Sequence, residues 1–472
     1  MKMNTAPIPL SEAETRLLFT TSDQRPVHFV GIAGAGMSAL AELFHRRGVA
    51  VSGCDASLAG AADLRALGVP LSAGHDPSHV ENSRALIITS AMPKDHPELR
   101  AARALGLPVI RRAEALGAAV NAGRLVAVAG THGKTTTTTM TTEALGAAGL
   151  DPTGMVGARV AAWAGNLRRG GDDVFVVEAD EYDRSFLALL PTVAVITNVE
   201  ADHLDIYADL ADIRATFARF AAPARYVVLC ADDAGARSVR LPSSAEVIGY
   251  GVAPSGDARL LARDVSPSGP GTHSTVEFDG AELGEMVLAV PGLHNVRNAL
   301  AAVASGLALG ARFDRLAAGL ATVVGAERRF QVLGEKRGVL VVDDYAHHPT
   351  EIEATLAAAR ATYPGRRIVA AFQPHLYSRT RDFAMEFGAA MAQADVAMVA
   401  DLYPAREQPI EGVTAALVAR ATEAAGKAVA WEGPRSAMAD ALARAVKPGD
   451  IVITLGAGDV TKTGPELLDR LS

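Results

Sequence analysis

The sequence has few aromatic residues, only two cysteines and no long hydrophobic run. No stretch approaches the roughly 18 apolar residues of a membrane-spanning helix, and the N-terminal "MKMNTAPIPLSEAETRLLF" has no apolar signal core before a small-residue cleavage site. Cys54 and Cys230 lie far apart and fit no C-x-x-C or Cys/His metal spacing, so both are interpreted as structural thiols. We therefore expect a soluble, cytoplasmic protein without membrane insertion.

The chain also lacks a net basic charge. Its formal charge is −8, and basic pairs such as Arg111-Arg112 and Arg168-Arg169 are scattered, which favours solvated surface for most of them. Nucleic acid is not expected as a partner, because phosphate contact generally needs a net basic face. What the chain does have is 49% hydrophobic residues over 472 positions, which suits an α/β protein of about three domains.

The first segment contains a glycine turn between two short apolar stretches. "VHFV" is interpreted as a buried strand, residues 37–47 as an amphipathic helix, and "VAVSGCD" as a second strand. Gly34, Gly36 and Ala39 have the G-x-G-x-x-A spacing, and Asp55 follows about twenty positions later. The pattern predicts a nucleotide-diphosphate site at the helix N-terminus, although it does not identify the nucleotide, and a plain glycine turn is the alternative.

A second glycine loop, "GTHGKTTTTTM" at residues 130–140, follows the apolar strand "RLVAVAG". The Walker A pattern places its first glycine five positions before the Gly-Lys pair, where this chain has Val128. Gly130 stands only three positions before Gly133. Strand, glycine loop, lysine, threonine and helix nevertheless form the context of a phosphate loop.

Lys134 is the only lysine between Lys94 and Lys336. If a lysine in this region holds the β- and γ-phosphates of a nucleotide, it must therefore be Lys134. Thr135 would then place its hydroxyl on magnesium.

Two more strands of the second segment end in polar groups. "DVFVVEADEYD" ends in Glu178, Asp180 and Glu181, and "TVAVITNVEADHLDIY" ends in Asn198, Asp202, His203 and Asp205. Both ends are expected to face the crevice of the phosphate loop, since ligands lie at the carboxyl ends of parallel strands. Carboxylates suit Mg²⁺, whereas the role of His203 stays open at this point. Capping or solvated acids are the favoured interpretation of Asp180, Glu181, Asp202 and Asp205.

Residues 254–286 change to short alternating stretches rich in Gly, Pro and Ser, which predicts a small antiparallel or irregular insertion. A helix is expected to begin near His294. Asn295 and Asn298 lie on one face of its first turns, where amides could read a base edge, although an Asn pair there is more often a cap.

The third segment opens with "GVLVVDDYAHHPTE", a strand that ends in Asp343, Asp344, Tyr345 and two histidines. A helix is expected from Pro349, because proline fits a first helical turn. Four further strand-then-loop patterns predict a third α/β layer structure with polar strand exits.

These motifs together resemble those of the Mur ligase family of peptidoglycan synthesis. The family's set is matched, in order, by "GTHGKTTT", "EADEYD", "TNVEADHLD", "GLHNVRNALAA", "RRF", "DDYAHHPTE" and "FQPHLYSRT". The resemblance runs from about Val27 to the C-terminus, and the family's phosphate loop has the shorter G-x-x-G-K-T form. "HFVGIAGAGMSALAE" favours the alanine-adding branch, and the branch that attaches a recycled tripeptide is the alternative.

The resemblance implies an α/β fold of three domains. Residues 1–123 would form a Rossmann-like domain for the UDP-sugar, residues 124–325 a central phosphate-loop ATPase domain with a mainly parallel sheet, and residues 326–472 a C-terminal Rossmann-like domain that closes over ATP and brings the amino acid. The implied substrates are UDP-N-acetylmuramate, L-alanine and ATP, with Mg²⁺ as cofactor, in a monomer or weak homodimer. The implied reaction forms an amide through an acyl phosphate and releases ADP and phosphate.

The resemblance also implies roles for individual residues. The catalytic residues would be Lys134, His203 and His347. ATP would be bound by Gly130, Thr131, Gly133, Lys134, Thr135, Thr136, His294, Asn295, Asn298, Arg329 and Asp344. The UDP-sugar would be bound by Gly34, Gly36, Met37, Ser38 and Asp55. The amino-acid pocket would contain Tyr345, His347, His375 and Arg379, and the metal ligands would be Thr135, Glu178 and His203.

Two departures from the family pattern matter. Leu376 stands where the family commonly has a second arginine, for which Arg379 or Arg381 could compensate. The absence of lysine from residue 135 to 335 excludes a carbamylated metal-site lysine from the central segment, which several sibling ligases use.

Two rival functions are weaker. An NAD-dependent oxidoreductase would place Asp55 on a ribose, but it leaves the phosphate loop and metal acids unexplained. A noncatalytic nucleotide-binding regulator does not need the intact set of Lys134, Thr135, Glu178 and His203.

Overall fold

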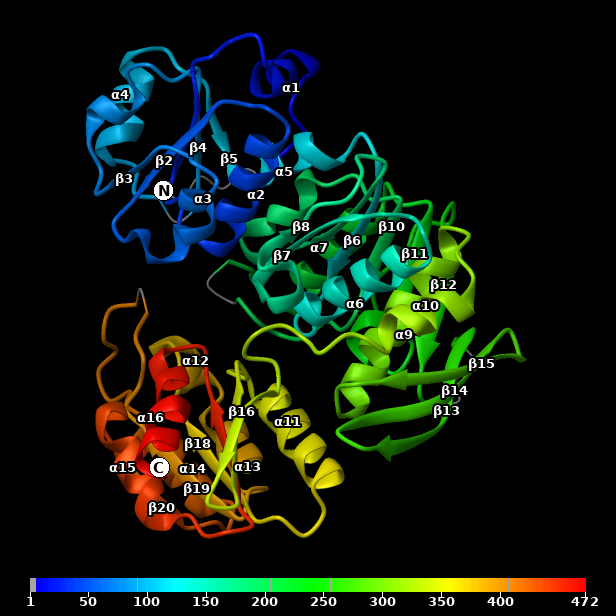
Figure 1. The fold of residues 1–472 in the computed structure, drawn as a ribbon, viewed down its shortest axis with the longest axis vertical. Helices are drawn as coiled ribbons and strands as arrows, with labels where there is room; N and C mark the ends of the chain where they lie inside the picture. Colours follow the sequence, from blue (N-terminus) through cyan, green and yellow to red (C-terminus); the bar gives the residue numbers. More distant parts are fainter. Residues whose placement is uncertain (1–5, 91, 204–205, 254–256, 406) are drawn as a thin grey trace. The chain divides into compact units, whose positions relative to one another are not determined.

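Three β-sheets organise the chain. The computed structural model describes residues 6–90, 92–203, 206–253, 257–405 and 407–472, and within them the sheets have five, ten and six strands. Figure 1 shows them in blue, in cyan to green, and in yellow to red. Each sheet falls in one of the three segments expected from the sequence, so the predicted three-domain α/β fold is confirmed. The borders between the segments stay a prediction.

The chain divides into two compact units. One consists of Met1–Arg263, Thr275–Met286 and Arg297–Val323, and the other of Asp264–Ser274, Val287–Val296 and Val324–Ser472. The N-terminal sheet and most of the central sheet belong to the first unit. No helix among the described residues is long and apolar enough to cross a membrane.

The N-terminal sheet has the order β3-β2-β1-β4-β5 with every pair parallel. β1 and β4 are buried along their whole length, as expected for parallel strands covered on both faces. The elements are α1 (Glu12–Phe19), β1 (Val27–Val30), α2 (Ala35–Arg46), β2 (Val51–Asp55), the 3₁₀ helix η1 (Leu58–Ala61), α3 (Ala62–Ala66), β3 (Leu71–Ala73), η2 (Pro77–Val80), β4 (Ala85–Ile88), α4 (Pro97–Ala104), β5 (Val109–Arg111) and α5 (Arg112–Val120). The predicted β-α-β unit is confirmed, with α2 starting two residues early because Gly34 is its N-cap.

The central sheet has the order β15-β14-β13-β12-β11-β10-β6-β9-β7-β8. β6, which leads into the phosphate loop, lies between β10 and β9 and is parallel to both. The elements are β6 (Arg124–Ala129), α6 (Lys134–Ala147), β7 (Thr153–Val160), η3 (Ala161–Trp163), β8 (Gly165–Arg168), β9 (Val174–Glu178), η4 (Tyr182–Ala188), β10 (Val193–Ile196), α7 (Leu210–Ala221), β11 (Tyr226–Cys230), α8 (Ala234–Arg237), β12 (Glu246–Gly251), β13 (Leu260–Ser268), β14 (Gly271–Phe278), β15 (Ala281–Leu288), α9 (Leu293–Ala308) and α10 (Phe313–Leu320).

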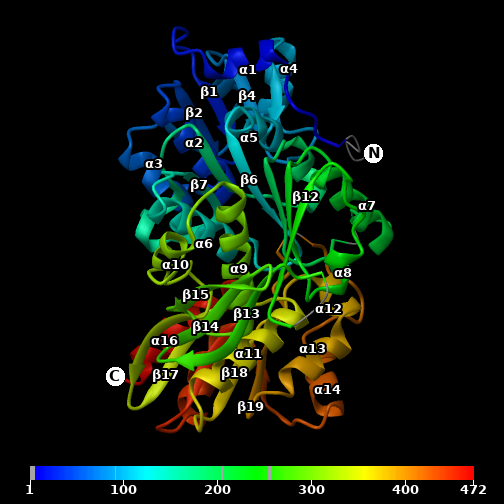
Figure 2. The same cartoon turned by 90° about the vertical axis from the view of Figure 1, so that its right-hand side faces the viewer.

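The predicted insertion forms the edge of this sheet. β13, β14 and β15 are neighbours (Figure 2) joined by connections of two residues. Such short connections join antiparallel strands only, because parallel strands need a crossover. The antiparallel interpretation is therefore confirmed, although residues 254–256 at the start of the predicted insertion lie outside the described residues.

The C-terminal sheet has the order β16-β17-β21-β18-β19-β20, with β16 antiparallel to β17 and the other pairs parallel. The elements are β16 (Gln331–Lys336), β17 (Val339–Asp344), α11 (Pro349–Thr362), β18 (Ile368–Phe372), α12 (Tyr377–Asp382), α13 (Ala384–Met391), β19 (Val396–Ala400), α14 (Ala416–Ala424), β20 (Val429–Gly433), α15 (Arg435–Ala445), β21 (Ile451–Leu455), η5 (Asp459–Lys462) and α16 (Thr463–Arg470). α11 begins at Pro349, as the sequence predicts.

The threonine-rich helix α6 is buried despite its hydroxyl groups. Thr138, Thr139, Thr141 and Thr142 each donate a hydrogen bond of 2.7–2.9 Å to the carbonyl oxygen four residues earlier. Internal bonding of this kind removes the cost of burying an unpaired hydroxyl. The helix can therefore pack closely while it presents its first turn to the phosphate loop.

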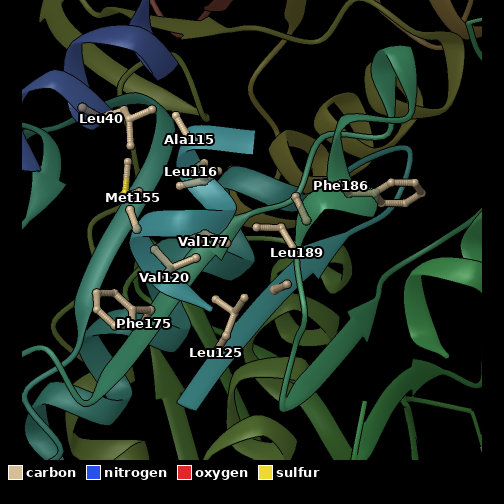
Figure 3. Close-up of a cluster of buried hydrophobic side chains, with 14 of the residues drawn as sticks. Leu40, Ala115, Leu116, Val120, Leu125, Met155, Phe175, Val177, Phe186 and Leu189 are labelled. Atoms are coloured by element: carbon tan, nitrogen blue, oxygen red, sulfur yellow. The ribbon is translucent and has the colours of Figure 1, made fainter. Parts of the chain in front are cut away.

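One hydrophobic cluster joins the N-terminal and central domains within the first unit. Leu40 of α2 and Leu116 of α5 belong to the same buried cluster as Met155 of β7 and Val177 of β9, and Figure 3 shows these side chains close together. Because the two sheets share this core, the glycine turn and the central strand ends are held in a fixed relation.

Two consecutive leucines test how much this core stabilises the fold. Leu189 is 3% exposed inside the cluster and Leu190 is 46% exposed. We expect Leu189→Ala to lower the free energy of unfolding by about 2–5 kcal/mol, and Leu190→Ala by less than about 0.5 kcal/mol. Urea unfolding followed by circular dichroism measures both, and equal losses in the two variants would contradict this packing.

Candidate active site

The predicted glycine turn lines a cavity of about 320 Å³ in the first unit. Gly34, Gly36 and Met37 at the N-terminus of α2 form one part of its wall, and Glu178 at the end of β9 forms another. The first N–H groups of a helix lack partners within the helix and favour an anion. The turn and the central-domain carboxylate therefore face one space.

Asp55 holds the backbone of the glycine turn through its carboxylate. Its carboxylate accepts hydrogen bonds from the backbone N–H of Ala33 and of Ser57, both at 3.1 Å. Ser38 donates from its hydroxyl to the Ala35 carbonyl oxygen at 3.0 Å. In this structure both predicted UDP-sugar residues hold the turn, and their contact with a ligand stays a prediction.

Arg112 is a residue whose place the sequence analysis missed. It was grouped with the scattered basic pairs that favour solvated surface, but it is half-buried and lines the cavity beside the turn. A Cβ added to Gly36 would lie only 2.9 Å from Arg112 Nη1, so the glycine makes room for the guanidinium. The available signal was its position directly after β5, at the carboxyl edge of the same parallel sheet.

The phosphate loop needs both of its glycines. Gly130 has φ +143°, and an added Cβ would lie 2.0 Å from Thr197 Oγ1. Gly133 has φ +82°, and an added Cβ would lie 2.7 Å from Asn298 Oδ1. Any larger side chain would be strained or would clash at either position. The shortened loop is thus fitted closely against its neighbours.

The end of β10 fixes the other side of the loop. The His132 N–H donates to Asn198 Oδ1 at 2.7 Å, and the Thr131 N–H donates to the Asn198 carbonyl at 3.1 Å. Thr131 Oγ1 in turn accepts from the Glu200 N–H at 2.9 Å. The two parallel strand ends therefore meet, as the sequence analysis expected.

Lys134 forms a buried ion pair with Glu181. Its Nζ lies 2.9 Å from both carboxylate oxygens and also donates to the Gly130 carbonyl at 2.6 Å. Glu181 is 3% exposed, so its interpretation as a capping or solvated acid is wrong. Glu181 directly precedes η4, and no local pattern in the sequence reveals its position next to the loop.

His203 joins the same ion pair. Its Nε2 lies 3.6 Å from Glu181 Oε1 and 3.8 Å from Asp202 Oδ2, and its ring packs edge-on to Tyr182 with centroids 5.1 Å apart. Its backbone has φ +54°, an uncommon conformation for a residue other than glycine. The structure thus brings Lys134 and His203 to one carboxylate.

Burial and charge oppose each other in this group. Burial lowers the pKa of the Lys134 ammonium, but Glu181 and Asp180 outweigh it and raise the pKa overall. Burial raises the pKa of Glu181, yet Lys134 and His203 bring it below its ordinary value. For His203, burial lowers the pKa, and the hydrogen bond with Glu181 and the charge of Asp202 raise it overall. All three groups therefore favour their charged forms.

Asp180 and Asp202, at the ends of the same strands, accept hydrogen bonds from backbone N–H groups close to them in the sequence. Asp180 accepts from the Tyr182 N–H at 3.0 Å, and Asp202 accepts from the His203 N–H at 2.7 Å. The capping interpretation suits both. Asp205 lies outside the described residues.

Thr135 and Glu178, two of the three predicted metal ligands, lie in direct contact, and metal binding by them stays a prediction. The Thr135 hydroxyl donates to Glu178 Oε2 at 2.9 Å, and the Gly157 N–H donates to the same oxygen at 2.7 Å. A hydroxyl and a carboxylate oxygen this close are hard ligands that fit Mg²⁺, which keeps several waters and needs few protein ligands. His203, in contrast, would have to release Glu181 before it could bind a metal.

The predicted base-contacting asparagines occupy the start of α9. Asn298 is buried and accepts from the Thr137 hydroxyl at 3.1 Å, so it braces α6 behind Gly133. Asn295 is also buried and donates to the Pro291 carbonyl at 2.7 Å. His294 lies against Gly292, where an added Cβ would come within 2.6 Å of its ring. Base recognition by these residues stays a prediction.

Several predicted residues of the second unit gather at the end of β17. The guanidinium of Arg329 lies 5.2 Å from the Tyr345 ring centroid and 3.9 Å from Glu351. Asp344 is 7% exposed and accepts from the N–H groups of Phe330 and Ala346, both at 2.8 Å. Burial raises the pKa of the Asp344 carboxyl to about 6, against the opposing charge of Arg329.

A chain of aromatic contacts continues from Tyr345. The His347 ring packs edge-on to Tyr345 at 5.1 Å and to His375 at 6.0 Å, and His375 stacks on Tyr403 at 5.9 Å. His347 Nδ1 also lies 3.1 Å from Glu351 Oε2. The structure therefore brings three of the four predicted amino-acid residues together.

The fourth predicted residue, Arg379, is buried in α12. Leu376, the departure from the family pattern, directly precedes this helix. Its φ of +70° is a conformation that is strained for residues other than glycine. Arg381 is exposed and paired with Asp382 at 2.7 Å. Of the two arginines that could compensate for Leu376, only Arg379 is buried.

The pKa of Asp344 predicts a pH effect on stability. The folded state holds this proton more tightly than the unfolded chain does, so stability present below the ordinary pKa of 3.8 is lost as the pH rises to about 6. Relative to Asp344→Asn, which cannot ionise, the wild type should lose up to roughly 3 kcal/mol between pH 4 and 7. Urea unfolding of both proteins at pH 4 and pH 7 measures this loss. If the difference in unfolding free energy between wild type and Asp344→Asn is the same at both pH values, the raised pKa of Asp344 is refuted.

Comparison with protein-family models finds matches along almost the whole chain. Residues 26–124 match the Mur ligase family, catalytic domain, residues 128–306 match the Mur ligase middle domain, and residues 328–458 match the Mur ligase, glutamate ligase domain.

Individual proteins are also similar over most of their length. The UDP-N-acetylmuramate–L-alanine ligase of Acidothermus cellulolyticus is 48% identical over 452 residues, which cover 94% of each chain. The crystal structure of the UDP-N-acetylmuramate-alanine ligase of Thermotoga maritima has a TM-score of 0.81 at 28% identity, covering 94% of this chain and 98% of that one. A murein peptide ligase of Psychrobacter arcticus shares the fold, with a TM-score of 0.69 at 24% identity, covering 95% of this chain and 98% of the other. The chain belongs to the Mur ligase family.

Proposed function

We propose that this chain is an ATP-dependent ligase that joins L-alanine to UDP-N-acetylmuramate in peptidoglycan precursor synthesis. One observation carries the proposal: Glu178 contacts Thr135 of the phosphate loop and also lines the cavity of the glycine turn. A UDP-sugar held at that turn would extend its carboxylate toward the terminal phosphate of ATP. The full-length similarity to alanine-adding relatives supports the choice of substrates.

The glycine turn would hold the diphosphate of the UDP-sugar. The N-terminus of α2 offers backbone N–H groups, and Arg112 adds a positive charge at the same cavity. Charge-assisted hydrogen bonds from a guanidinium to phosphate are strong and directional. Gly36 keeps the space that the guanidinium occupies.

Lys134 would exchange one anion for another when ATP binds. In this structure Glu181 neutralises its buried ammonium, and the β- and γ-phosphates would take over that role. Two anions, a carboxylate and a phosphoryl group, must then approach each other, so catalysis requires cations where negative charge accumulates. The Lys134 ammonium supplies such a charge at this place.

The reaction proceeds in two displacements. A carboxylate oxygen of the sugar attacks the γ-phosphorus, the bond to the bridging oxygen breaks, and ADP leaves. The amine of L-alanine then attacks the carbonyl carbon of the acyl phosphate, inorganic phosphate leaves, and the amine loses a proton. We assign that proton to His347, which Glu351 holds through Nδ1.

Mg²⁺ would be held by Thr135 and Glu178, with His203 available for a second ion once Glu181 is released. The ion supplies positive charge that offsets the phosphate oxygens during transfer. The two oxygen donors lie 2.9 Å apart, so both could reach one ion.

The amino acid would bind between the aromatic chain of Tyr345, His347 and His375 and the buried Arg379. A guanidinium pairs with a carboxylate through two parallel hydrogen bonds. Arg379 is therefore the proposed partner of the L-alanine carboxylate.

A tripeptide-adding ligase of the same family is the second candidate, because it would share the phosphate loop and metal acids. Phosphate release from ATP with Mg²⁺ and UDP-N-acetylmuramate separates the two candidates. We expect release only when L-alanine is added, and not with the tripeptide or without an acceptor. Release that requires the tripeptide would assign the chain to the other branch.

Lys134→Ala tests the phosphate loop. We expect phosphate release to fall by at least about 10³-fold, because the variant loses the charge that meets the transferred phosphoryl group. Lys447→Ala, which changes an exposed lysine of the C-terminal domain, is the control and should keep normal turnover. Near-normal turnover of a folded Lys134→Ala protein would defeat the assignment.

Arg379→Ala tests the amino-acid pocket. The loss of a carboxylate partner should raise the KM for L-alanine by about 10-fold or more, with little change in the KM for ATP. Arg381→Ala, two residues away and exposed, is the matched control. Equal increases in both KM values would assign Arg379 to domain closure or to phosphate.

A further inference from the structure

A group of histidines in the N-terminal domain surrounds one buried carboxylate, apart from the proposed active site. We name it the histidine cluster. It consists of His28, Cys54, His75, His79, His96 and Glu98. Four of the chain's 12 histidines are gathered here, and no step of the proposed reaction uses them.

The fold brings these residues together from four elements. His28 lies on β1 directly beside Ser52 of β2, and Cys54 is two residues further along the same face. His79 belongs to η2, and Glu98 lies in the first turn of α4. No spacing in the sequence reveals this group, because its members are contributed by segments that are separated by about twenty residues each.

Glu98 is the centre of the cluster and is 0% exposed. Its Oε1 lies 2.7 Å from His79 Nδ1, and the Cys54 thiol lies 3.0 and 3.1 Å from its two oxygens. His75 Nδ1 is 3.6 Å from Oε2, and His96 Nδ1 is 4.0 Å from it. The negative charge is thus enclosed by nitrogen and sulfur atoms that can bind a metal.

The surplus of electron-pair donors points to a ligand. His28 is 2% exposed, its Nδ1 bonds Ser52 Oγ at 2.9 Å, and its Nε2 is buried with no hydrogen-bond partner among the described residues. His96 Nδ1 is buried in the same way. A buried polar atom without a partner costs free energy, and the unpaired Nε2 of His28 indicates that a partner other than protein belongs beside it.

We propose that His28, Cys54, His79 and Glu98 bind a divalent transition-metal ion, with Zn²⁺ as the ion of choice. One ligand atom from each of the four lies within 4.8 Å of the ligand atoms of the other three. A tetrahedral zinc site with bonds of 2.0–2.3 Å has ligand atoms about 3.3–3.8 Å apart. The carboxylate contacts at 2.7–3.1 Å would open by roughly half an ångström as the ion replaces the shared protons.

Charge also fits this ion. A thiolate and a carboxylate carry two negative charges, which Zn²⁺ neutralises, and two neutral imidazoles complete the set. Burial without net charge avoids the desolvation cost of an unpaired ion. Binding releases the thiol proton of Cys54 to solvent. Sulfur and imidazole donors exclude Mg²⁺ and Ca²⁺, which prefer oxygen.

The metal would stabilise the structure beside the glycine turn. The carbonyl oxygen of Cys54 accepts from the N–H groups of Gly31 and Ile32 at 2.8 and 3.0 Å. A metal bond to Cys54 would therefore tie α4 and η2 to the strand that holds the turn, and the ion would take no part in phosphoryl transfer.

Cobalt(II) spectroscopy of the full-length, untagged protein tests the proposal. After removal of metal with a chelator, an equimolar amount of Co²⁺ should produce the sulfur-to-cobalt charge-transfer band, and Zn²⁺ should abolish it. The band should be absent from Cys54→Ser and present in Cys230→Ser, which changes the buried cysteine of β11. His28→Ala should bind Co²⁺ at least about tenfold more weakly.

Thermal unfolding gives a second readout that needs no cysteine variant. Zn²⁺ should raise the Tm of the metal-free wild type, because an ion that binds only the folded state stabilises it, and the rise should be lost in His28→Ala. A wild type with no charge-transfer band, a band that persists in Cys54→Ser, or equal Tm shifts in wild type and His28→Ala would overturn the proposal. The cluster would then be a hydrogen-bonded network only.

Discussion

The position of one carboxylate, Glu178, is the constraint on which the candidate active site depends. It ends β9 next to β6, so the parallel register of these strands places it opposite the first turn of α6. There it accepts from the Thr135 hydroxyl and the Gly157 N–H, and it also lines the cavity of the glycine turn of α2. Glu178 therefore lies beside two helix N-termini, and each of them is suited to a phosphate group.

The arrangement is stable because the N-terminal and central domains share a core. Leu40 and Leu116 of the first domain pack in the same buried cluster as Met155 and Val177 of the second. The relation between the glycine turn and Glu178 is therefore set by packing, which is short-ranged and stiff. Catalysis by positioning requires this kind of rigidity.

The buried charges of the phosphate loop are paired within the protein. Lys134, Glu181 and His203 are buried together, and each neutralises the desolvation cost of another. A nucleotide would replace Glu181 as the partner of Lys134. The Lys134 ammonium is therefore buried with a carboxylate partner and not as an unpaired charge.

The sequence predicted the parts of the fold that depend on local patterns. The β-α-β unit, the helix after the phosphate loop, the antiparallel insertion and the helix at Pro349 follow from hydrophobic period, glycine and proline. The polar strand ends also met at one edge, because parallel strands align their carboxyl ends.

Features that depend on contacts between distant segments escaped prediction. Glu181 was expected to be a capping or solvated acid, yet it is buried and paired with Lys134. Arg112 was counted among surface charges, yet it lies against Gly36. The histidine cluster has no motif spacing, since its ligands come from four elements. Side-chain burial across elements is the information that a single sequence does not carry.

The central claim is that the sugar carboxylate attacks the phosphate of ATP at the site between Lys134 and Glu178. The most direct measurement is isotope transfer from UDP-N-acetylmuramate labelled with ¹⁸O in its carboxylate, in the presence of ATP and L-alanine. An acyl phosphate places one labelled oxygen in the released inorganic phosphate, which mass spectrometry detects. Inorganic phosphate without label, formed at the rate of amide product, would contradict the account.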